Sequence, residues 1–505
     1  MNNVKQWVRR SVVVAGIAVG STVIQMPMAA SAFSQTLHIG QNADLTSFDP
    51  TELRIGTYVS THLLYNSLIR LDEKGEPQPE LAKEWSFSQD GRTMTLNLVD
   101  GAVFHSGRPM TSKDVAFSIE YAKTPAVGAN ILPLAKLVEK VDTPDDKTVI
   151  LHLNGAPAAV YDLLDLLFIV DAENPKKIKT SGNGTGPFKL VAYEPGQNAV
   201  FARNEKYWRQ KPALPKIEIK IVPDTQSALA QLRSGAIDFL PVVNQESLEQ
   251  IKSLDFKIGV AAAEGRVLDV SINIKSPQFE KPEVRRAMSL AIDRERIASE
   301  VAGQGAVVKC LPWATRSTAE SAGFDNACRY DLAEAKALID KAGAAGTEVE
   351  LLSYSQAVPE LGAMAQILQS AMKQIGLNAK ITDLSEAAFV SRFRKSNFQA
   401  TAHSYVRAGR SPAAILLTAV PFRPVGNVLG FESQSYADDV ALVTTNIDPQ
   451  ITAPAWKRIN EQLLTQNFVI PVSTLPVTWV STPKLDGVRF NLDGMPIFEQ
   501  ATLKK

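Results

Sequence analysis

The sequence predicts an α/β protein with more than one domain. Its 505 residues exceed what a single hydrophobic core normally supports. A helical pattern that stops at a glycine and leads into a short apolar strand occurs at 225–239, 331–352 and 361–381, and this alternation is typical of α/β lobes. The composition is that of an ordinary globular protein, with 45% hydrophobic and 21% charged residues. Because Lys+Arg and Asp+Glu both number 53, the charge favours neither nucleic acid nor an anionic membrane as a partner.

Residues 1–32 are expected to be a secretory signal peptide that lies outside the fold. Three cations precede position 11, and an uncharged, mostly apolar run follows from 11 to 24, which is too short to span a bilayer comfortably. Ala30-Ser31-Ala32 has the small-x-small form of a cleavage site, so we expect cleavage after Ala32. An uncleaved N-terminal anchor is the alternative interpretation.

The chain has two cysteines, Cys310 and Cys328. In an exported protein an even count favours a disulfide, which would stabilise the fold by roughly 3 kcal/mol for a loop of this size. Two buried thiols are the alternative. A metal site is not expected here, because no histidine or further cysteine lies at ligand spacing nearby.

Residues 90–122 predict a strand, a turn and a helix in close succession. The period-2 alternation of 93–99 is typical of a half-buried strand, and Asp100-Gly101 supplies the tight turn after it. Thr111 is expected to cap the helix, with Asp114 at the third helical position as in a capping box.

This stretch resembles a motif of the bacterial extracellular solute-binding proteins of family 5, the periplasmic proteins that deliver dipeptides, oligopeptides and nickel chelates to ABC importers. In that family a strand is followed by L-x-D/E-G-V-x-F-H-x-G, then P-x-T-x-x-D-V, then a helix. The chain matches at Leu98–His105, Gly107 and Pro109–Val115. Pro79–Trp85 is similar to the family's P-x-L-A-x-x-W, and Arg203–Trp208 is similar to its R-N-x-x-Y-W.

The segment Gly182–Phe188, GNGTGPF, looks at first like a phosphate-binding loop. A dinucleotide fingerprint, however, needs a helix to open directly after its third glycine. Here Pro187 follows that glycine and FKLVAY reads as a strand, so no helix N-terminus is available for a phosphate. The segment instead resembles the G-T-G-P-Y/F turn of the same family, and we expect no nucleotide site.

The remaining elements are predicted from periodicity and turn residues. Residues 142–153 are expected to form a turn at 144–147 and then a strand. Further strands are expected at 36–40, 188–193, 217–222, 237–239, 267–274, 348–352, 378–381, 469–475 and 478–480, and helices at 57–68, 225–234, 282–301, 331–343, 361–374 and 453–464.

No pattern in the sequence indicates catalysis. The G-x-S-x-G, G-x-x-x-x-G-K-[ST] and H-E-x-x-H motifs are all missing from the sequence. The five histidines are scattered singly, and each is more typical of a structural or surface residue than of a base or ligand; they are His38, His62, His105, His152 and His403. We therefore expect no catalytic residue, no metal site and no cofactor.

The resemblance points to residues 404–412 as a loop that determines ligand specificity. In the peptide-binding members this loop reads roughly G-W-x-x-D-Y-x-D-P, and its first aspartate receives the α-ammonium group of the peptide. Here Tyr405 stands in place of the tryptophan and Ala408 in place of that aspartate. Arg407 and Arg410 add two cations to a loop that is acidic in the peptide binders.

A guanidinium group suits a carboxylate or phosphate, whereas a buried ammonium group without a carboxylate partner is costly. We therefore expect Arg407 or Arg410 to meet an anionic group of the ligand, with Tyr405 and Ala408 beside it. His403 could line the same pocket. In the alternative interpretation both arginines face solvent or pair with acidic residues, and His403 is structural.

The resemblance also implies an architecture, the two-lobe periplasmic-binding-protein fold (type II, cluster C) with an additional inserted α/β domain. Domain I would combine residues 33–65, 187–269 and 480–505. Domain II would be the insertion, residues 66–186, and domain III would be the second lobe, residues 270–479.

The implied function is that of a monomeric, non-enzymatic periplasmic receptor. It would capture a peptide or peptide-like solute between its lobes and deliver it to an inner-membrane ABC permease with its ATPase subunits. An anionic non-peptide solute, such as an opine or a sugar-acid conjugate, is the second interpretation, and a nickel chelate is the third. From a different class, a secreted hydrolase or an exported chaperone also remains open.

Overall fold

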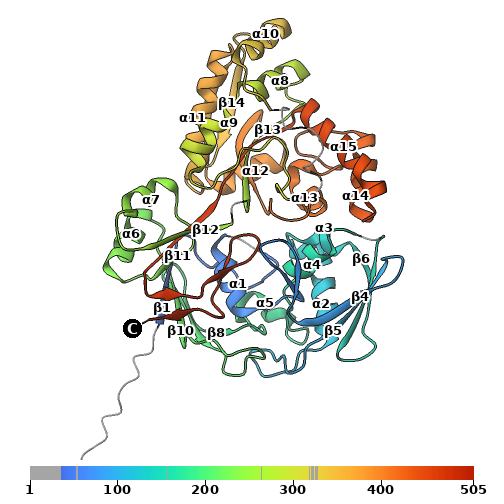
Figure 1. Cartoon of the computed structure of the whole chain (residues 1–505), viewed down its shortest axis with the longest axis vertical. Helices are drawn as coiled ribbons and strands as arrows, with labels where there is room; N and C mark the ends of the chain where they lie inside the picture. The colour runs from blue at the N-terminus through green and yellow to red at the C-terminus, as the bar shows by residue number, and fades with distance from the viewer. Residues whose placement is uncertain are drawn as a thin grey trace, which may run out of the picture. The chain divides into compact units, whose positions relative to one another are not determined.

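A computed structural model describes residues 36–504, apart from 53–54, 156, 263, 318, 320–323 and 325–327. The expected signal peptide, residues 1–32, and its cleavage site after Ala32 lie outside these described residues. The chain is a mixture of helices and several sheets, which confirms the predicted α/β class (Figure 1).

A seven-stranded sheet joins segments that are far apart in the sequence. Its first strand, β1, pairs in parallel with β10 and β11, and β18, from near the C-terminus, pairs with β11 and β12 (Figure 1). In spatial order its strands are β12 (Lys257–Ala262), β18 (Val477–Ser481), β11 (Phe239–Leu240), β1 (Thr36–Gln41), β10 (Lys216–Ile221), β9 (Asn198–Arg203) and β8 (Phe188–Glu194).

Two further sheets are each built from one continuous region. The four-stranded sheet is antiparallel, in the order β4 (Ala82–Phe87), β5 (Thr93–Leu98), β7 (Thr148–Leu153) and β6 (Val138–Asp142). The five-stranded sheet has the order β15 (Asn378–Asp383), β14 (Glu348–Ser353), β16 (Ala400–Val406), β13 (Arg266–Ile272) and β17 (Val469–Thr474).

Short strand pairs and helices complete the described part of the chain. The pairs are β2 (Ile69–Leu71) with β3 (Pro77–Pro79), β19 (Leu485–Asp486) with β22 (Thr502–Leu503), and β20 (Arg489–Phe490) with β21 (Pro496–Ile497). The α-helices are α1 (Tyr58–Leu64), α2 (Ser112–Lys123), α3 (Leu132–Ala135), α4 (Val160–Leu166), α5 (Ile178–Ser181), α6 (Thr225–Ser234), α7 (Gln245–Ile251), α8 (Pro282–Ala291), α9 (Arg294–Ile297), α10 (Leu332–Ala342), α11 (Pro359–Gln374), α12 (Glu386–Arg394), α13 (Pro412–Thr418), α14 (Gln434–Thr445) and α15 (Pro449–Gln466). The shorter helical turns are η1 (Ile55–Thr57), η2 (Pro125–Val127), η3 (Pro175–Lys177), η4 (Ala298–Ala302) and η5 (Val420–Phe422). Among the described helices, none combines the length and the apolar character needed to cross a lipid bilayer.

Most predicted elements form within a few residues of their expected bounds, and three differ. The single helix expected at 282–301 ends at Ala291, because Asp293 starts a new helix by accepting the Arg296 N–H at 3.0 Å. The helix expected at 57–68 already ends at Leu64, whose carbonyl accepts the N–H of Gly186 at 2.9 Å. The strand expected at 237–239 pairs only over Phe239–Leu240.

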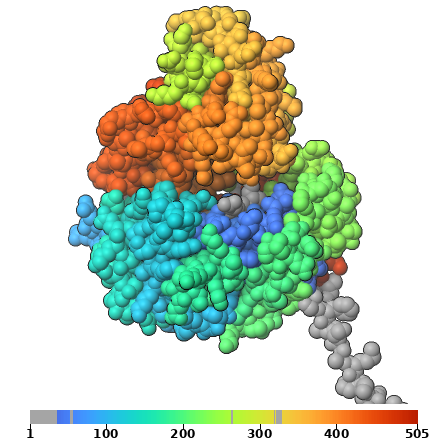
Figure 2. Space-filling model, turned by 180° about the vertical axis from the view of Figure 1, so that it is seen from behind, coloured from blue at the N-terminus to red at the C-terminus, as the bar shows by residue number. Residues whose placement is uncertain are grey.

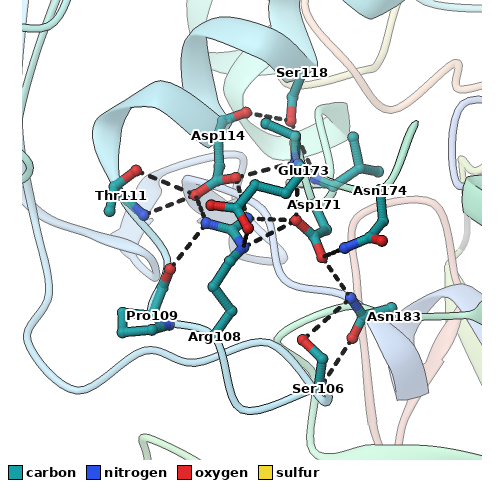
Figure 3. A network of polar contacts seen from close by, with 12 residues as sticks. Ser106, Arg108, Pro109, Thr111, Asp114, Ser118, Asp171, Glu173, Asn174 and Asn183 are labelled. Carbon is teal, nitrogen blue, oxygen red and sulfur yellow. Dashed lines mark hydrogen bonds and ion pairs between the residues drawn. The ribbon is translucent and has the colours of Figure 1, made fainter.

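The motif that carries the family resemblance folds into a buried polar network (Figure 3). Arg108 donates its Nε hydrogen bond to Asp171 at 3.0 Å and also pairs with Asp114. The Asp114 carboxylate accepts the Thr111 N–H at 2.9 Å, as the predicted capping box requires, and Asn183 binds Asp171 at 2.8 Å. The network therefore ties the start of α2 to two distant loops, which is a structural role.

Cys310 and Cys328 are joined by a disulfide, with their Cα atoms 5.4 Å apart. This crosslink bridges the segment between η4 and α10, beside the five-stranded sheet.

The strands and helices enclose two large apolar cores. One is built from residues between Val267 and Leu475, and the other mainly from residues before 240 together with the C-terminal strands. Helix α13 contributes to both cores. Its Ala413 and Ala414 belong to the second core, whereas Ile415 and Leu416 belong to the first. The segment 407–414 therefore spans from one core to the other.

Candidate functional site

Two short connections lead from the seven-stranded to the five-stranded sheet. The chain passes from β12 to β13 between Ala262 and Arg266, and it returns from β17 to β18 between Thr474 and Val477. A pair of short crossovers between two packed bodies is a hinge geometry. In Figure 2 the orange surface, formed by residues near 400, meets the cyan and blue surfaces along a seam.

A pocket opens beside these crossovers. Its cavity volume is about 50 Å³, so the pocket is narrow. Its walls come from four parts of the fold. They are Tyr58 and His62 of α1, Asp165, Leu166 and Phe168 of α4 and the segment after it, Gly265, Arg266, Val406, Arg407 and Val477 at the crossovers, and Asn491, Asp493 and Met495 near the C-terminus.

Strand pairing brings Arg266 and Arg407 into this wall together. Arg266 begins β13 opposite Val406 on β16, and the N–H of Arg407 continues the ladder by donating to the Gly265 carbonyl at 2.9 Å. Among the residues that the structure describes, neither guanidinium group has a hydrogen-bond or ion-pair partner. Two cations in a pocket wall, neither paired with a side chain among the described residues, are an arrangement suited to an anionic group of a ligand.

The backbone at Arg407 is also unusual. Its φ is +67°, in the left-handed region that L-residues other than Asn and Asp seldom adopt. A conformation of this kind costs on the order of 1–3 kcal/mol and concentrates at ligand sites. The strained backbone and the unpaired guanidinium group coincide in the same residue, which supports a binding role for Arg407.

Arg410, three residues later, is placed quite differently. Its side chain is 0% exposed, and it pairs with Asp165 at 2.7 Å and with Asp493 at 2.6 Å. The Asp162 carboxylate lies 3.5 Å away and also accepts a hydrogen bond from Ser411 Oγ. The Arg410 guanidinium is thus engaged by carboxylates from α4 and from the C-terminal turn, and Arg410 itself is not part of the pocket wall.

Burial and charge act against one another in this cluster. Burial raises the pKa of Asp162 to about 6, although Arg410 and Ser411 lower it, and burial also raises the pKa of Asp165. Burial alone would lower the pKa of Arg410, but Asp493, Asp165 and Asp162 outweigh it and raise that pKa. Removal of the guanidinium group would leave three carboxylates without their shared partner.

Tyr58 and His62 face the same pocket from α1. Burial raises the pKa of Tyr58, opposed by the positive charge of Arg407, which indicates that the phenol and the guanidinium group lie near each other. Burial, aided by Arg70, lowers the pKa of His62 to about 3, so its imidazole is neutral at physiological pH. His62 Nε2 lies 3.2 Å from the Asn491 amide nitrogen, which can donate to it.

The other predicted site residues lie outside the pocket wall. The Tyr405 hydroxyl is buried and donates to the Pro312 carbonyl at 2.9 Å. Ala408 is 1% exposed and belongs to the core of the five-stranded sheet. His403 Nδ1 lies 2.9 Å from the buried Asp269 carboxylate, and its ring stacks on Phe393, which is a structural setting.

Several pocket residues carry no signal in the sequence. Arg266 precedes an ordinary apolar strand, and Asp493 with Gly494 reads as a plain turn. Asp165 and His62 each stand in a short apolar segment without a motif. These side chains meet only because the fold brings segments more than two hundred residues apart to the same crossovers.

Comparison with known proteins identifies the family. The family model of the bacterial extracellular solute-binding proteins, family 5 Middle, matches residues 76–420. The dipeptide-binding protein of Escherichia coli (strain K12) is 26% identical over 423 residues, which cover 76% of this chain and 78% of that protein.

Solved structures share the fold. The periplasmic binding protein DppA from Helicobacter pylori, in complex with the peptide STSA, superposes with a TM-score of 0.80 at 21% identity, covering 93% of this chain and 98% of that one. The binding protein AgaA from A.tumefacien R10, in complex with agropinic acid, superposes with a TM-score of 0.81 at 22% identity, covering 93% of this chain and 99% of that one. These similarities confirm the predicted type II periplasmic-binding-protein fold. Since the family model covers most of the chain, this protein belongs to the bacterial extracellular solute-binding proteins of family 5.

Proposed function

We propose that this protein is the solute receptor of an ABC importer. In this proposal it captures a peptide or peptide-like solute in the pocket at the crossovers and delivers it to an inner-membrane permease with its ATPase subunits. The observation that carries the proposal is the pair Arg266 and Arg407, two guanidinium groups in one pocket wall without an anionic partner among the described residues.

The narrowness of the pocket supports a mechanism by closure. The cavity has a volume of only about 50 Å³, which is too small for a peptide in this arrangement. Rotation about the two crossovers would open the pocket by moving Arg266 and Arg407 away from Tyr58 and Asp493. A solute that contacts both sides would then stabilise the closed form, which is the form that a permease can distinguish from the open one.

The groups in the pocket favour binding over catalysis. Among the described residues, the pocket wall contains no serine, threonine or cysteine that His62 could activate as a nucleophile. Within the described part of the chain, no group of three His, Cys, Asp or Glu side chains could hold a metal ion. We therefore propose a non-enzymatic role that needs no cofactor.

An anionic solute is the second candidate. The two arginines without a partner among the described residues favour it, and the similar fold of AgaA occurs in complex with agropinic acid. An opine or a sugar-acid conjugate would present carboxylates to Arg266 and Arg407. A nickel chelate has less support, because His62 is the only histidine in the pocket wall among the described residues.

The remaining parts of the proposal concern the chain as a whole. We propose export to the periplasm with cleavage after Ala32, and a monomeric mature protein. We also propose that domain II is the insertion 66–186 and that domain III is the second lobe, 270–479. Domain I then combines 33–65, 187–269 and 480–505, which is consistent with a seven-stranded sheet that takes strands from all three segments or their borders.

Titration calorimetry with Arg407→Ala tests the binding role. The protein is titrated with a defined mixture of dipeptides and tripeptides, and the active component is then titrated alone. We expect Arg407→Ala to weaken binding by about tenfold to a hundredfold, because a charged hydrogen-bond pair is lost. Arg296→Ala, an exposed arginine of α9 paired with Glu300, is the matched control and should bind like the unaltered protein. Equal affinity of the Arg407→Ala variant would contradict the proposal.

A further inference from the structure

One segment outside the pocket wall is bound to both crossovers. It is the stretch 307–317 between η4 and α10, which we name the strap. At its start, the Val307 N–H donates to Thr474 Oγ1 at 2.9 Å, and the Val307 carbonyl accepts the Thr474 N–H at 2.8 Å. Near its end, the Thr315 N–H donates to Glu264 Oε2 at 2.8 Å. Because Thr474 begins one crossover and Glu264 lies in the other, the strap contacts both.

The middle of the strap is fixed in the first core, the core of the five-stranded sheet. Leu311 and Trp313 are buried there, and the Trp313 indole N–H donates to Asn460 Oδ1 at 2.7 Å. The disulfide joins Cys310 of the strap to Cys328. These contacts attach the strap to the first core, so that the two move together.

Arg316, at the far end of the strap, extends away from this core. Its Nη2 donates a hydrogen bond to the Gly409 carbonyl, in the turn that follows β16. The same guanidinium group lies over Gly75, where a Cβ atom would be 3.4 Å from Nη2 and 3.7 Å from Nε. Gly75 belongs to the turn between β2 and β3, and Leu71 of β2 is part of the second core. Arg316 therefore contacts a turn that is attached to the other core.

The β2–β3 turn carries an excess of negative charge. Residues 72–76 read Asp-Glu-Lys-Gly-Glu, which is three anions and one cation. Asp72 Oδ1 accepts the N–H groups of Lys74 and Glu76, both at 2.9 Å, and this fixes the shape of the turn. The side chains of Glu73 and Glu76 remain exposed. A guanidinium group over this turn is attracted by its charge, and salt weakens an attraction between exposed charges.

We infer that Arg316 is a clasp, a positioning residue that holds the turn 407–410 of the pocket wall against the β2–β3 turn. Arg316 is not itself part of the pocket wall among the described residues. The clasp would stabilise the arrangement in which the pocket is closed, and it would raise the affinity for a solute without touching it. The effect on affinity rests on the proposed function, whereas the effect on the arrangement of the two cores does not.

A second contact joins the same two turns and supports the inference. Asp165 accepts a hydrogen bond from the Leu71 N–H of β2 at 2.9 Å, and its other oxygen accepts from Arg410 at 2.7 Å. The turn 407–410 is thus connected to the β2–β3 hairpin by two routes. One is buried and passes through Asp165, and the other lies at the surface and passes through Arg316.

The first test removes the clasp and measures two properties. Calorimetry uses the component of the dipeptide and tripeptide mixture that binds the unaltered protein. We expect Arg316→Ala to weaken its binding by about threefold to tenfold, because an exposed charged contact contributes less than a buried one. Small-angle X-ray scattering of the solute-free variant should show a larger radius of gyration. Arg329→Ala, an exposed arginine paired with Asp331, is the matched control and should change neither property.

The second test uses the charge of the β2–β3 turn. We expect Glu76→Lys to weaken binding of the same component by about twofold to fivefold at low salt, because the turn then attracts Arg316 less. The difference should shrink in about 1 M salt, where the Debye length is about 3 Å. Combining Arg316→Glu with Glu76→Lys should restore part of the affinity that Arg316→Glu loses alone, since the two charges are exchanged.

Each outcome decides between the proposals. Unchanged affinity and unchanged scattering of Arg316→Ala would overturn the clasp. A lower free energy of unfolding with unchanged affinity and scattering would assign Arg316 to the stability of the strap alone and would also overturn the clasp. If no component binds the unaltered protein but Arg316→Ala still has the larger radius of gyration, the clasp stands and the proposed function fails.

Discussion

Arg407 and Arg410 are three residues apart in one loop, yet their guanidinium groups have opposite surroundings. Arg410 is fully buried and holds three carboxylates, while Arg407 lines a pocket without a partner among the described residues. Arg407, with a φ of +67°, lies in the turn between β16 and the start of α13, and Arg410 lies at the end of that turn. The first residue of the pair is suited to binding and the second to holding the fold together.

Replacement of Arg410 should therefore affect stability. We expect Arg410→Met to lower the free energy of unfolding by about 3–5 kcal/mol, because breaking a buried ion cluster leaves unpaired charges in the interior. Urea denaturation at neutral pH measures the change. Arg407→Ala is the control, and it should stay within about 0.5 kcal/mol of the unaltered protein because no partner is lost. Equal stability of Arg410→Met would mean that the cluster does not hold the fold together.

The sequence directs attention to the loop 404–412, but it does not distinguish the surroundings of the two arginines within it. The departure from the family pattern at 405–411 predicted that arginine chemistry matters there, and Arg407 does line the pocket. The pairing of Arg410 with Asp162, Asp165 and Asp493 could not be predicted, because those aspartates lie more than eighty residues away in sequence and carry no motif. The ligand-binding roles of Tyr405, Ala408 and His403 stay predictions without support from the pocket geometry.

At the scale of elements, the turn GNGTGPF shows why a glycine-rich segment need not bind phosphate. The Gly186 N–H donates to the Leu64 carbonyl at 2.9 Å, which docks the turn on the end of α1. A Cβ atom on Gly184 would overlap the carbonyl oxygen of Leu64, and one on Gly186 would overlap the same peptide group. The glycines are needed for close packing against the helix that carries Tyr58 and His62 into the pocket.

Enlarging this turn should loosen the contact. We expect Gly184→Ala to lower the free energy of unfolding by about 1–3 kcal/mol, because an added methyl group must displace backbone atoms. Thermal and urea unfolding measure the effect. Gly409→Ala is the control, since the nearest heavy atom to its added Cβ would lie 3.6 Å away, an ordinary contact. Similar losses in both variants would show that the overlap at Leu64 is relieved by local adjustment.

Elements with strong local signals were predicted well. The strand at 93–98, the helix at 225–234 and the helix between Asp331 and Gly343 formed within a residue or two of their expected bounds. The sequence does not predict that α8 ends at Ala291. The apolar pattern continues beyond that residue, through the point where Asp293 caps α9. Helices α12, α13 and α14 were not predicted at all, since tertiary packing rather than a clear amphipathic pattern sets them.

At the scale of the whole molecule, the two crossovers relate folding to function. Both connect the seven-stranded to the five-stranded sheet, and the pocket forms directly beside them. A rotation there would change the separation of Arg266 and Arg407 from Asp165 and Asp493 across the pocket. The Arg410 cluster adds buried ion pairs between the segment after β16 and the C-terminal turn beside the pocket.

The most direct test of this account is native mass spectrometry of the protein purified from the periplasm, compared with its Arg407→Ala variant. We expect the unaltered protein to carry a peptide or peptide-like solute, which is released chemically unchanged on unfolding. The variant should carry little or none. The same solute retained at equal occupancy in Arg407→Ala, or released as a cleavage product, would contradict the account.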